Sequence, residues 1–365
     1  MEQHSSTTAN ETHGFNSTTF QESNSLHQMT IHYIERVFSG IVILIIILLG
    51  CVGNALIIIS VIMSRKLRTS TNIFVVSLST ADIMTSLALS AFLLPRFHSS
   101  GWPLPNHEWL CSGSAFIVFT CNGASLYNLA AIAVNRLLLI IRPTLYKKVY
   151  TPLHSTLMVI TIWFIPMSIC LFLPLAGIGG FGFDSTDFTC SDQDDHPKAG
   201  VFNMAQIVSV FPIPLILITV SYTWIGCHVK AHFKRQLQNE LDNFAERTHE
   251  QQSHHQRTGR QENIKREQLE ITKNLFTVVC IFFICYLPYF IISVIPGWTH
   301  AVYYLKLLVL ANSSLNPIVY SYKHPHFKDV IGKLLHCRYA DIPEPSHILQ
   351  SIRQRSAVIE PSRSN

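Results

Sequence analysis

Residues 37–64 read VFSGIVILIIILLGCVGNALIIISVIMS and hold no charged side chain. A bilayer core of about 30 Å is crossed by roughly 20 helical residues, and this stretch is longer than that. Six further apolar blocks follow it along the chain: residues 70–94, 111–134, 151–183, 199–227, 274–298 and 301–322. In lipid, backbone polar groups must bond within their own segment, which favours helices. The sequence therefore predicts an all-α membrane protein, a bundle of seven transmembrane helices.

The composition of the whole chain agrees with a membrane location. Only 13% of its 365 residues are charged, against about 25% in soluble domains, and the mean hydropathy is +0.28. The formal net charge of +5 is too small to indicate a nucleic-acid partner. The spans contain neither paired carboxylates nor a His-Glu-x-x-His pattern, so we expect no enzymatic activity.

Glycosylation triplets and basic residues indicate the orientation. Triplets start at Asn10 and Asn16, although chance also produces them in a Ser/Thr-rich segment. Most of the 27 Lys and Arg lie in the tail and in the connections on its side of the membrane; the exceptions are Arg36, Arg96, Lys198 and Lys306. By the positive-inside rule we expect a plasma-membrane protein with its N-terminus outside and its C-terminus in the cytoplasm.

These features divide the chain into parts. We expect a glycosylated extracellular N-terminus over residues 1–35, a seven-helix domain over 36–323, an amphipathic helix on the inner leaflet over 324–337 and a cytoplasmic tail over 338–365. Within the helical domain, residues 230–272 form a polar third cytoplasmic loop that we expect to be flexible. Cys337 follows the amphipathic helix and either carries palmitate or remains a free thiol.

Asp82 is the charged group that most needs an explanation, since it lies inside the second span. A carboxylate at mid-membrane costs about 2.5–3.5 kcal/mol on insertion scales, so it should face the bundle interior. Other spans offer partners: Asn54, Ser79, Ser125, Asn312, Ser313 and Asn316. Such oxygens suit Na⁺, a hard cation, but they equally suit a protonated carboxyl in a structural network. The residues alone leave both readings open.

Each predicted span contains a short motif or a single distinctive residue. They are Gly53-Asn54, Leu78-Ser79-Thr80-Ala81-Asp82, Cys111, Asn135-Arg136, Trp163, Pro214, Tyr222, Cys285-Tyr286-Leu287-Pro288 and Asn316-Pro317-Ile318-Val319-Tyr320. Together they resemble rhodopsin-like (class A) G-protein-coupled receptors. Within that family, residues 72–78 (NIFVVSL) and 131–136 (AIAVNR) are most similar to melatonin receptors and melatonin-receptor-like orphan receptors. The resemblance implies a cell-surface receptor that converts binding of an extracellular small ligand into heterotrimeric G-protein activation, through outward movement of span six. It also implies an inhibitory G protein, arrestin and a receptor kinase as partners.

The resemblance further assigns roles to single residues. It implies an allosteric Na⁺ site at Asp82, Ser125, Asn312, Ser313 and Asn316, and no other cofactor. It implies G-protein coupling and activation roles for Asn135, Arg136, Tyr222, Phe282, Tyr286, Pro288, Pro317 and Tyr320. It implies a disulfide between Cys111 and Cys190, both of which lie on the oxidising side.

Two departures from the family pattern concern activation. The acidic residue that usually precedes the arginine is Asn135 here, which offers Arg136 only a weaker, neutral hydrogen bond. We therefore predict a loosened resting state and measurable signalling without ligand. Tyr286 replaces the commoner tryptophan of the switch, so the side chain is smaller but carries a hydroxyl.

The ligand is harder to predict. Val118 stands where aminergic receptors carry an aspartate, Leu310 where opsins carry the retinal lysine, and Val210 where a melatonin site has histidine. The remaining pocket candidates are Asn122, Asn203, Gln206, Ser209 and Tyr289, with the cations Arg96 and Lys306. The two cations would attract an anionic ligand if they face inward; otherwise they snorkel to the headgroups or pair with the acidic outer loop.

Two other functions remain as alternatives. The altered Asn135-Arg136-Leu137 motif is compatible with a scaffold or decoy receptor that no longer couples. An ion transporter would need a charged relay across the membrane, whereas only Asp82 and Lys306 carry charge within the spans.

Overall fold

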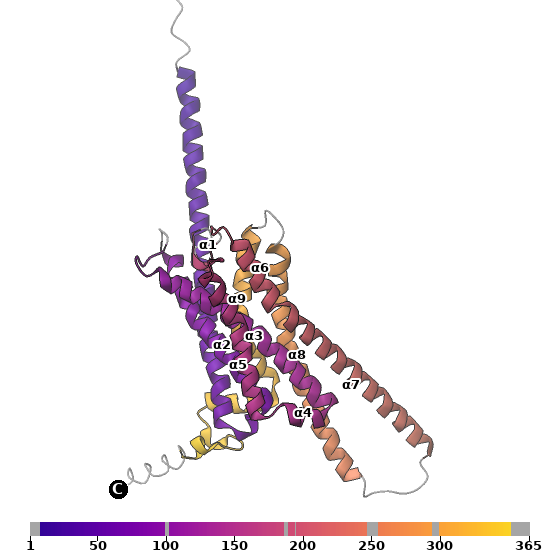
Figure 1. Ribbon diagram of the computed structural model, residues 1–365. Helices are drawn as coiled ribbons and strands as arrows, with labels where there is room; N and C mark the ends of the chain where they lie inside the picture. The colour runs from indigo at the N-terminus through magenta and orange to yellow at the C-terminus, as the bar shows by residue number, and fades with distance from the viewer. Residues whose placement is uncertain are drawn as a thin grey trace, which may run out of the picture.

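A bundle of long helices forms the body of the protein (Figure 1). The computed structural model describes residues 8–98, 102–185, 189–193, 195–246, 255–293 and 299–351. The long helices are α1 (Thr8–Met63), α2 (Ser70–Leu93), α3 (Glu108–Ile141), α5 (Pro152–Leu175), α6 (Ala199–Val210) with α7 (Pro212–Glu246), α8 (His255–Ser293) and α9 (Thr299–Lys323). Six segments of them are long and apolar enough to cross a bilayer, and α9, with 25 residues, is the seventh span. The predicted seven-helix bundle is confirmed.

Capping and proline chemistry set several helix boundaries. Thr69 caps α2 by accepting a hydrogen bond from the Asn72 backbone N–H at 3.3 Å, and Thr151 caps α5 in the same way. Span five is interrupted at Phe211, where α6 ends and α7 begins. Pro212 follows this break at once, and proline has no N–H to continue a helix ladder.

The hydropathy of residues 151–183 predicts one continuous helix, but only the first part of this block is helical. Helix α5 ends at Leu175, and the chain turns through Gly177 and Gly179, whose φ angles are 72° and 71°. This left-handed backbone suits glycine. Strands β1 (Phe181–Asp184) and β2 (Thr189–Asp192) then form an antiparallel hairpin. The end of the block is apolar because the hairpin packs on the bundle: the Phe181 ring lies 5.2 Å from that of Phe202.

The connection between spans five and six also differs from its prediction as a flexible loop. Helix α7 continues to Glu246 and α8 begins at His255, so most of residues 230–272 are helical. Both helices extend well beyond the bundle in Figure 1. Helix α1 extends similarly at the opposite end. It includes the backbone of Asn10 and Asn16, whose side chains lie outside the described part of the chain.

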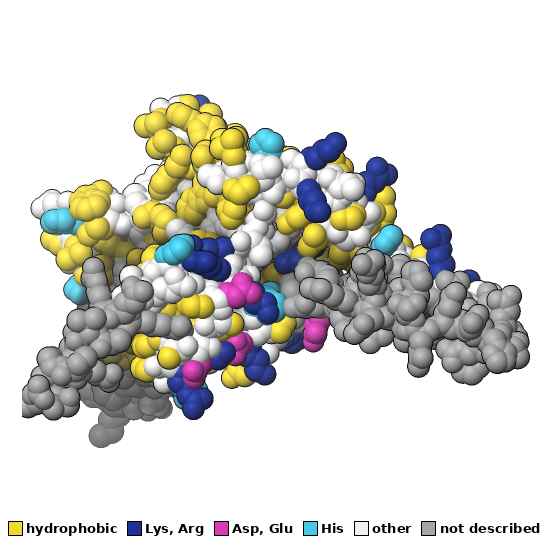
Figure 2. Space-filling model, turned by 90° about the horizontal axis from the view of Figure 1, so that it is seen from below, with side chains coloured by type: hydrophobic (Ala, Val, Ile, Leu, Met, Phe, Trp, Pro, Cys, Tyr) yellow, Lys and Arg dark blue, Asp and Glu magenta, His cyan; other side chains and the backbone are white. Residues whose placement is uncertain are grey.

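Short elements close the inner end of the bundle, where the described chain also ends (Figure 1). They are η1 (Arg65–Leu67), α4 (Pro143–Val149), α10 (Pro325–Leu335) and η3 (Tyr339–Asp341); η2 (Pro95–Phe97) lies after α2. Lys and Arg side chains recur across this end of the molecule (Figure 2). They include Arg65, Lys66, Lys147, Lys148 and Lys333.

The apolar face of α10 packs on protein. Phe327, Val330, Ile331 and Leu334 are buried and share a core cluster with Ile342 and Leu349 of the tail. The tail is also bonded to the first inner connection: the Arg65 N–H donates to the Glu344 carbonyl at 2.8 Å, and the Ser346 N–H donates to the Met63 carbonyl at 2.9 Å. The expected amphipathic helix is present, but its apolar stripe faces the bundle and the tail instead of lying open to the leaflet.

Candidate functional site

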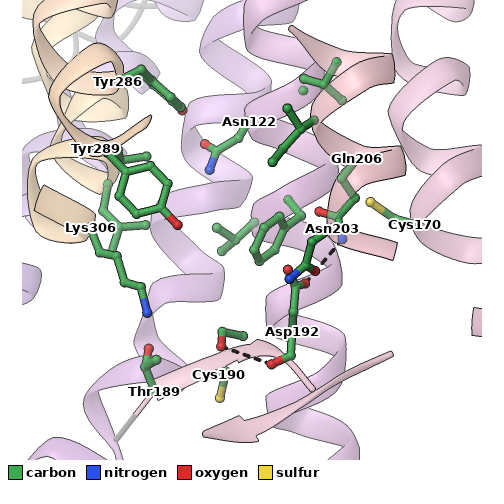
Figure 3. Close-up of a pocket in the computed structure, with 18 of the residues that line it drawn as sticks. Asn122, Cys170, Thr189, Cys190, Asp192, Asn203, Gln206, Tyr286, Tyr289 and Lys306 are labelled. Carbon is green, nitrogen blue, oxygen red and sulfur yellow. Dashed lines mark hydrogen bonds between the residues drawn. The ribbon is translucent and has the colours of Figure 1, made fainter. Parts of the chain in front are cut away.

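A cavity of about 440 Å³ lies in the outer half of the bundle, lined by α2, η2, α3, α5, α6, α8 and α9 and by strand β2 (Figure 3). Its volume falls in the range of small-molecule sites, about 300–1,000 Å³. The predicted disulfide is present: Cys111 of α3 is bonded to Cys190 of β2. This bond ties the hairpin to the bundle, and Cys190 itself lines the cavity.

All but one of the residues predicted for the ligand pocket line this one cavity: Arg96, Val118, Asn122, Asn203, Gln206, Tyr289 and Lys306. The exception is Ser209, which is not part of the lining and whose hydroxyl donates to the Ala205 carbonyl at 2.7 Å. Sequence reasoning missed Thr189, Asp192 and Cys170, which also line it. The two hairpin residues gave no sequence signal, because their position depends on how the hairpin folds back over the helices. Cys170 also gave no sequence signal, because it lies in an apolar stretch like that of any other span.

Polar groups stand on opposite walls of the cavity. On one wall the Gln206 Nε2 donates to Asp192 Oδ1 at 3.3 Å. On the other, Figure 3 shows the side chains of Tyr289 and Lys306 pointing into the space, with the Lys306 ammonium group directed toward the hairpin. One polar atom on each side is buried without a hydrogen-bond partner: Asn203 Oδ1 beside Gln206, and the Tyr286 hydroxyl on the side of Tyr289 (Figure 3). A ligand could satisfy both atoms, which are otherwise costly to leave unpaired.

Tyr286 connects the cavity to the inner half of the bundle. Its ring lines the cavity and stacks on Phe282 one turn further in, with the centroids 4.1 Å apart. It also lies 6.0 Å from the ring of Phe211. Phe282 is buried in the inner core cluster, and Pro288 lies within the same helix. A ligand that displaces Tyr286 would therefore act on packing beneath the site.

Asp82 stands in a hydrogen-bonded cluster at the centre of the bundle, fully buried. Asn316 Nδ2 of α9 donates to its Oδ2 at 2.8 Å, and Ser125 Oγ of α3 donates to its Oδ1 at 3.3 Å. The Ser313 side chain also bonds to the carboxyl group. Four of the five residues predicted for the sodium site are thus joined directly, and Asn312 is the neighbour of Ser313 in α9.

Unpaired oxygens surround this cluster. Four buried side-chain oxygens near Asp82 or its partners have no hydrogen-bond partner: those of Asn54 (Oδ1), Ser79, Asn312 (Oδ1) and Asn316 (Oδ1). Asn54 Nδ2 donates to the Ser313 carbonyl at 2.9 Å, which holds α1 beside the cluster. Hard cations prefer oxygen ligands, so an anionic centre ringed by unpaired oxygens fits Na⁺.

Arg136 lies at the inner end of α3, with Asn135 beside it. The oxygen of Asn135 accepts a hydrogen bond from Thr71 Oγ1 at 2.6 Å, so it is directed at α2, and its Nδ2 is buried without a partner. Thr71 gave no signal in the sequence. Its contact means that the amide oxygen, the one group able to accept from Arg136, is already shared with another donor.

Tyrosines from three elements surround Arg136. Tyr146, Tyr222 and Tyr320 interact with it electrostatically, and the hydroxyls of the last two are buried without hydrogen-bond partners. His324, which precedes α10, also lies in this group. Burial, together with the charge of Arg136, lowers the pKa of His324 to about 3. Among the described residues here, Arg136 is thus a buried cation beside two hydroxyl groups that have no hydrogen-bond partner.

Comparison with known proteins agrees with this arrangement. Residues 53–320 match the family "7 transmembrane receptor (rhodopsin family)". The chain is 24% identical to the melatonin receptor type 1C of Gallus gallus, over 82% of this chain and 83% of that receptor. It is 26% identical to the galanin receptor 2b of Danio rerio, over 82% and 75%. Its fold is similar to that of squid rhodopsin, with a TM-score of 0.71 at 20% identity over 88% of this chain and 91% of that one.

Proposed function

The chain belongs to the rhodopsin family of seven-transmembrane receptors, and from this membership we propose that it converts binding of an extracellular small ligand into activation of a heterotrimeric G protein. It is a receptor and not an enzyme. The ligand enters the outer cavity, and the inner end of α8 moves outward to admit the Gα subunit beside Arg136. The N-terminus is then extracellular and the tail cytoplasmic, with arrestin and a receptor kinase as further partners there.

The observation that carries this proposal is the Tyr286–Phe282 stack. It is the continuous aromatic path from the cavity to the inner core. A ligand shifts a conformational equilibrium only by its differential affinity for the two states. Tyr286 supplies such a difference, because its ring and its unpaired hydroxyl form part of the cavity wall. Movement of this ring changes the packing that holds the inner half of α8, below Pro288.

The direct test measures whether the receptor activates G proteins in the absence of any ligand. The full chain is expressed with a panel of chimeric G proteins, and basal activation is measured at matched surface expression. We expect activation of at least one chimera, with the inhibitory type as the first candidate given the similarity to melatonin receptors. Arg136→Ala should reduce it at least tenfold, whereas Arg142→Ala, at the end of the same helix, should not. Equal activity of Arg136→Ala and the wild type would contradict the proposal.

A non-coupling scaffold or decoy is the second candidate. One observation favours it: Thr71 donates a hydrogen bond to the oxygen of Asn135. Asn135 stands where the family usually has the acidic partner of the arginine, and its oxygen is therefore already engaged by another residue. The same panel distinguishes the two. A receptor that reaches the surface and binds small molecules but activates no chimera, with or without them, is a decoy. An ion transporter has less support, because Asp82 and Lys306 are too few for a relay.

We further propose that Na⁺ binds beside Asp82, with Ser125, Asn312, Ser313 and Asn316. The support is the group of unpaired oxygens around the carboxyl group. Binding to the folded state alone raises stability. The melting temperature of the purified receptor should therefore rise in NaCl relative to choline chloride of equal ionic strength, and Asp82→Asn should abolish this difference. If the variant responds as the wild type does, the purely structural reading of the cluster holds instead.

A further inference from the structure

We propose that His196 is a proton-binding site that controls the outer cover of the cavity. In the closed arrangement the neutral imidazole ring ties the turn before the hairpin to the start of α6. Protonation of the ring breaks this tie and gives the open arrangement. The proposal goes beyond the proposed function, because it depends neither on the identity of the ligand nor on coupling to a G protein.

Two backbone N–H groups donate to the same ring nitrogen of His196. The Gly179 nitrogen lies 3.2 Å from Nδ1, and the Lys198 nitrogen lies 3.1 Å from it. A backbone N–H can only donate, so Nδ1 must present its lone pair, and the proton of the neutral ring is on Nε2. A proton added at Nδ1 would turn this acceptor into a donor that faces two other donors. Both bonds are therefore lost together.

The two bonds join segments that cover the cavity. Gly179 lies in the turn between α5 and β1, and Lys198 directly precedes α6. The turn packs closely on α6, since a Cβ at Gly179 would overlap the Phe202 side chain. It is also bonded to the end of the hairpin, where the Gln193 N–H donates to the Gly180 carbonyl at 3.0 Å. Because β2 and α6 both line the cavity, release of the turn changes its cover.

The place of His196 beside a helix start acts in the same direction. The N-terminus of a helix carries a partial positive charge, so a cation there is unfavourable. The imidazole is two residues before the N-cap of α6 and bonds to that residue. The closed arrangement therefore opposes protonation, and it binds fewer protons than the open one. Its stability is present at neutral pH and is lost as pH falls.

The elements around His196 carry few other titratable groups. The turn over residues 176–180 and helix α6 contain none. Asp195 and Lys198, on the same segment as His196, are exposed, so salt screens their charges. Imidazole is the side chain whose charge ordinarily changes between pH 5 and 8. The neighbouring elements contribute Glu108 of α3, Cys170 of α5, Asp184 of β1 and Asp192 of β2, and Asp187 and Asp194 lie outside the described residues.

A second histidine, His107, shows the opposite geometry. Its Nδ1 lies 3.1 Å from the Pro105 carbonyl oxygen, which can only accept. The ring therefore donates this bond, and a doubly protonated ring donates it as well. His107 is exposed and directly precedes α3. It is a matched control, because protonation removes the bonds of His196 and preserves that of His107.

The experiment measures hydrogen exchange in the purified full-length receptor at pH 7.5 and pH 5.5. The reporters are the amides of Gly179 and Lys198, corrected for the intrinsic pH dependence of amide exchange. A free imidazole has a pKa of about 6.5, so its protonation shifts the opening equilibrium about tenfold between these two pH values. We expect protection of both amides to fall by about that factor at the lower pH. Equal protection at the two pH values would overturn the proposal.

Variants assign the effect to the ring. In His196→Asn the amide oxygen takes the place of Nδ1 and accepts at either pH, so protection should be the same at both. In His196→Ala no acceptor remains, and protection should be low at both. His107→Asn should keep the pH dependence of the wild type. If His196→Asn kept it too, another group would be the proton acceptor and the assignment to His196 would be wrong.

Discussion

Two buried polar clusters, one at mid-bundle around Asp82 and one at the inner end around Arg136, differ in what their unpaired atoms can bind. Around Asp82 the carboxyl group accepts bonds from α3 and α9, and the remaining oxygens lie about an anion. Around Arg136 the unpaired groups are the hydroxyls of Tyr222 and Tyr320, which lie about a cation.

The difference separates two kinds of partner. An anionic centre with spare oxygens suits a small cation, whereas a cationic centre with spare hydroxyls suits an acceptor such as a carbonyl or carboxylate of another chain. The mid-bundle cluster also ties three helices by direct bonds. The hydroxyls at the inner end have no such bond, so another arrangement of α7, α8 and α9 can gain bonds there. We therefore expect the inner cluster to rearrange on activation, whereas the Asp82 cluster keeps its hydrogen bonds.

The largest effect on stability is expected when the mid-bundle cluster loses its acceptor. Asp82→Ala leaves the Asn316 amide and the Ser125 hydroxyl without the bonds that they donate. Each unsatisfied buried group costs about 1–3 kcal/mol, so we expect a loss of about 3 kcal/mol in the free energy of unfolding. Thermal unfolding in detergent measures it.

Asp82→Asn serves as the control, because the amide oxygen can still accept one of these bonds, and its loss should be smaller. If Asp82→Ala were as stable as the wild type, the carboxyl group would not be what ties the helices together.

An intermediate effect is expected from restoring an acid at the inner cluster. In Asn135→Asp the carboxylate can accept from Thr71 and from Arg136 together, whereas the amide offers one oxygen that Thr71 already uses. A charge-assisted bond is stronger by roughly 1 kcal/mol, which corresponds to about fivefold in population. We expect basal G-protein activation to fall by about that factor. Neutral Asn135→Ser should not lower it, and equal basal activity of wild type and Asn135→Asp would refute the loosened resting state.

A third effect, of similar size, concerns pH at the inner cluster. His324 stays neutral in the folded chain because its pKa is lowered to about 3, while the unfolded chain takes up a proton near pH 6.5. The unfolded state therefore binds more protons as pH falls below 6.5, and stability decreases by up to about 1.4 kcal/mol per pH unit. The receptor should melt at lower temperature at pH 5.5 than at pH 7.

His324→Asn should flatten this dependence between pH 7 and 5.5. His336→Asn, on the exposed end of α10, is the matched control and should leave the slope as it is in the wild type. An identical slope in wild type and His324→Asn would show that other groups cause the acid sensitivity.

Hydropathy predicted the membrane class and the number of spans, because lipid forces long apolar blocks to become helices. The same signal failed at residues 176–183 and could not foresee the helices of the third cytoplasmic loop. An apolar hairpin that packs on the bundle reads like the end of a span, and charged helices beyond the membrane read like a loop. Hydropathy reports burial, which both lipid and protein provide.

The motif positions likewise predicted that Asp82, Ser125, Ser313 and Asn316 form one site, since charged groups inside lipid need partners from other helices. The positions of Thr71, Asp192 and His324 could not be foreseen. Each acquires its role from an interaction with a residue of another structural element: Asn135, Gln206 and Arg136 respectively.

The sequence by itself therefore determined the bundle, its spans and the charged residues that require an explanation. Only the tertiary structure decided where Lys306 and Arg96 point, which oxygen Thr71 occupies and which hydroxyls stay unpaired. The physical reason is range: the cost of a polar group in lipid depends on local sequence alone, whereas a hydrogen bond or a cavity wall depends on helices brought together by folding.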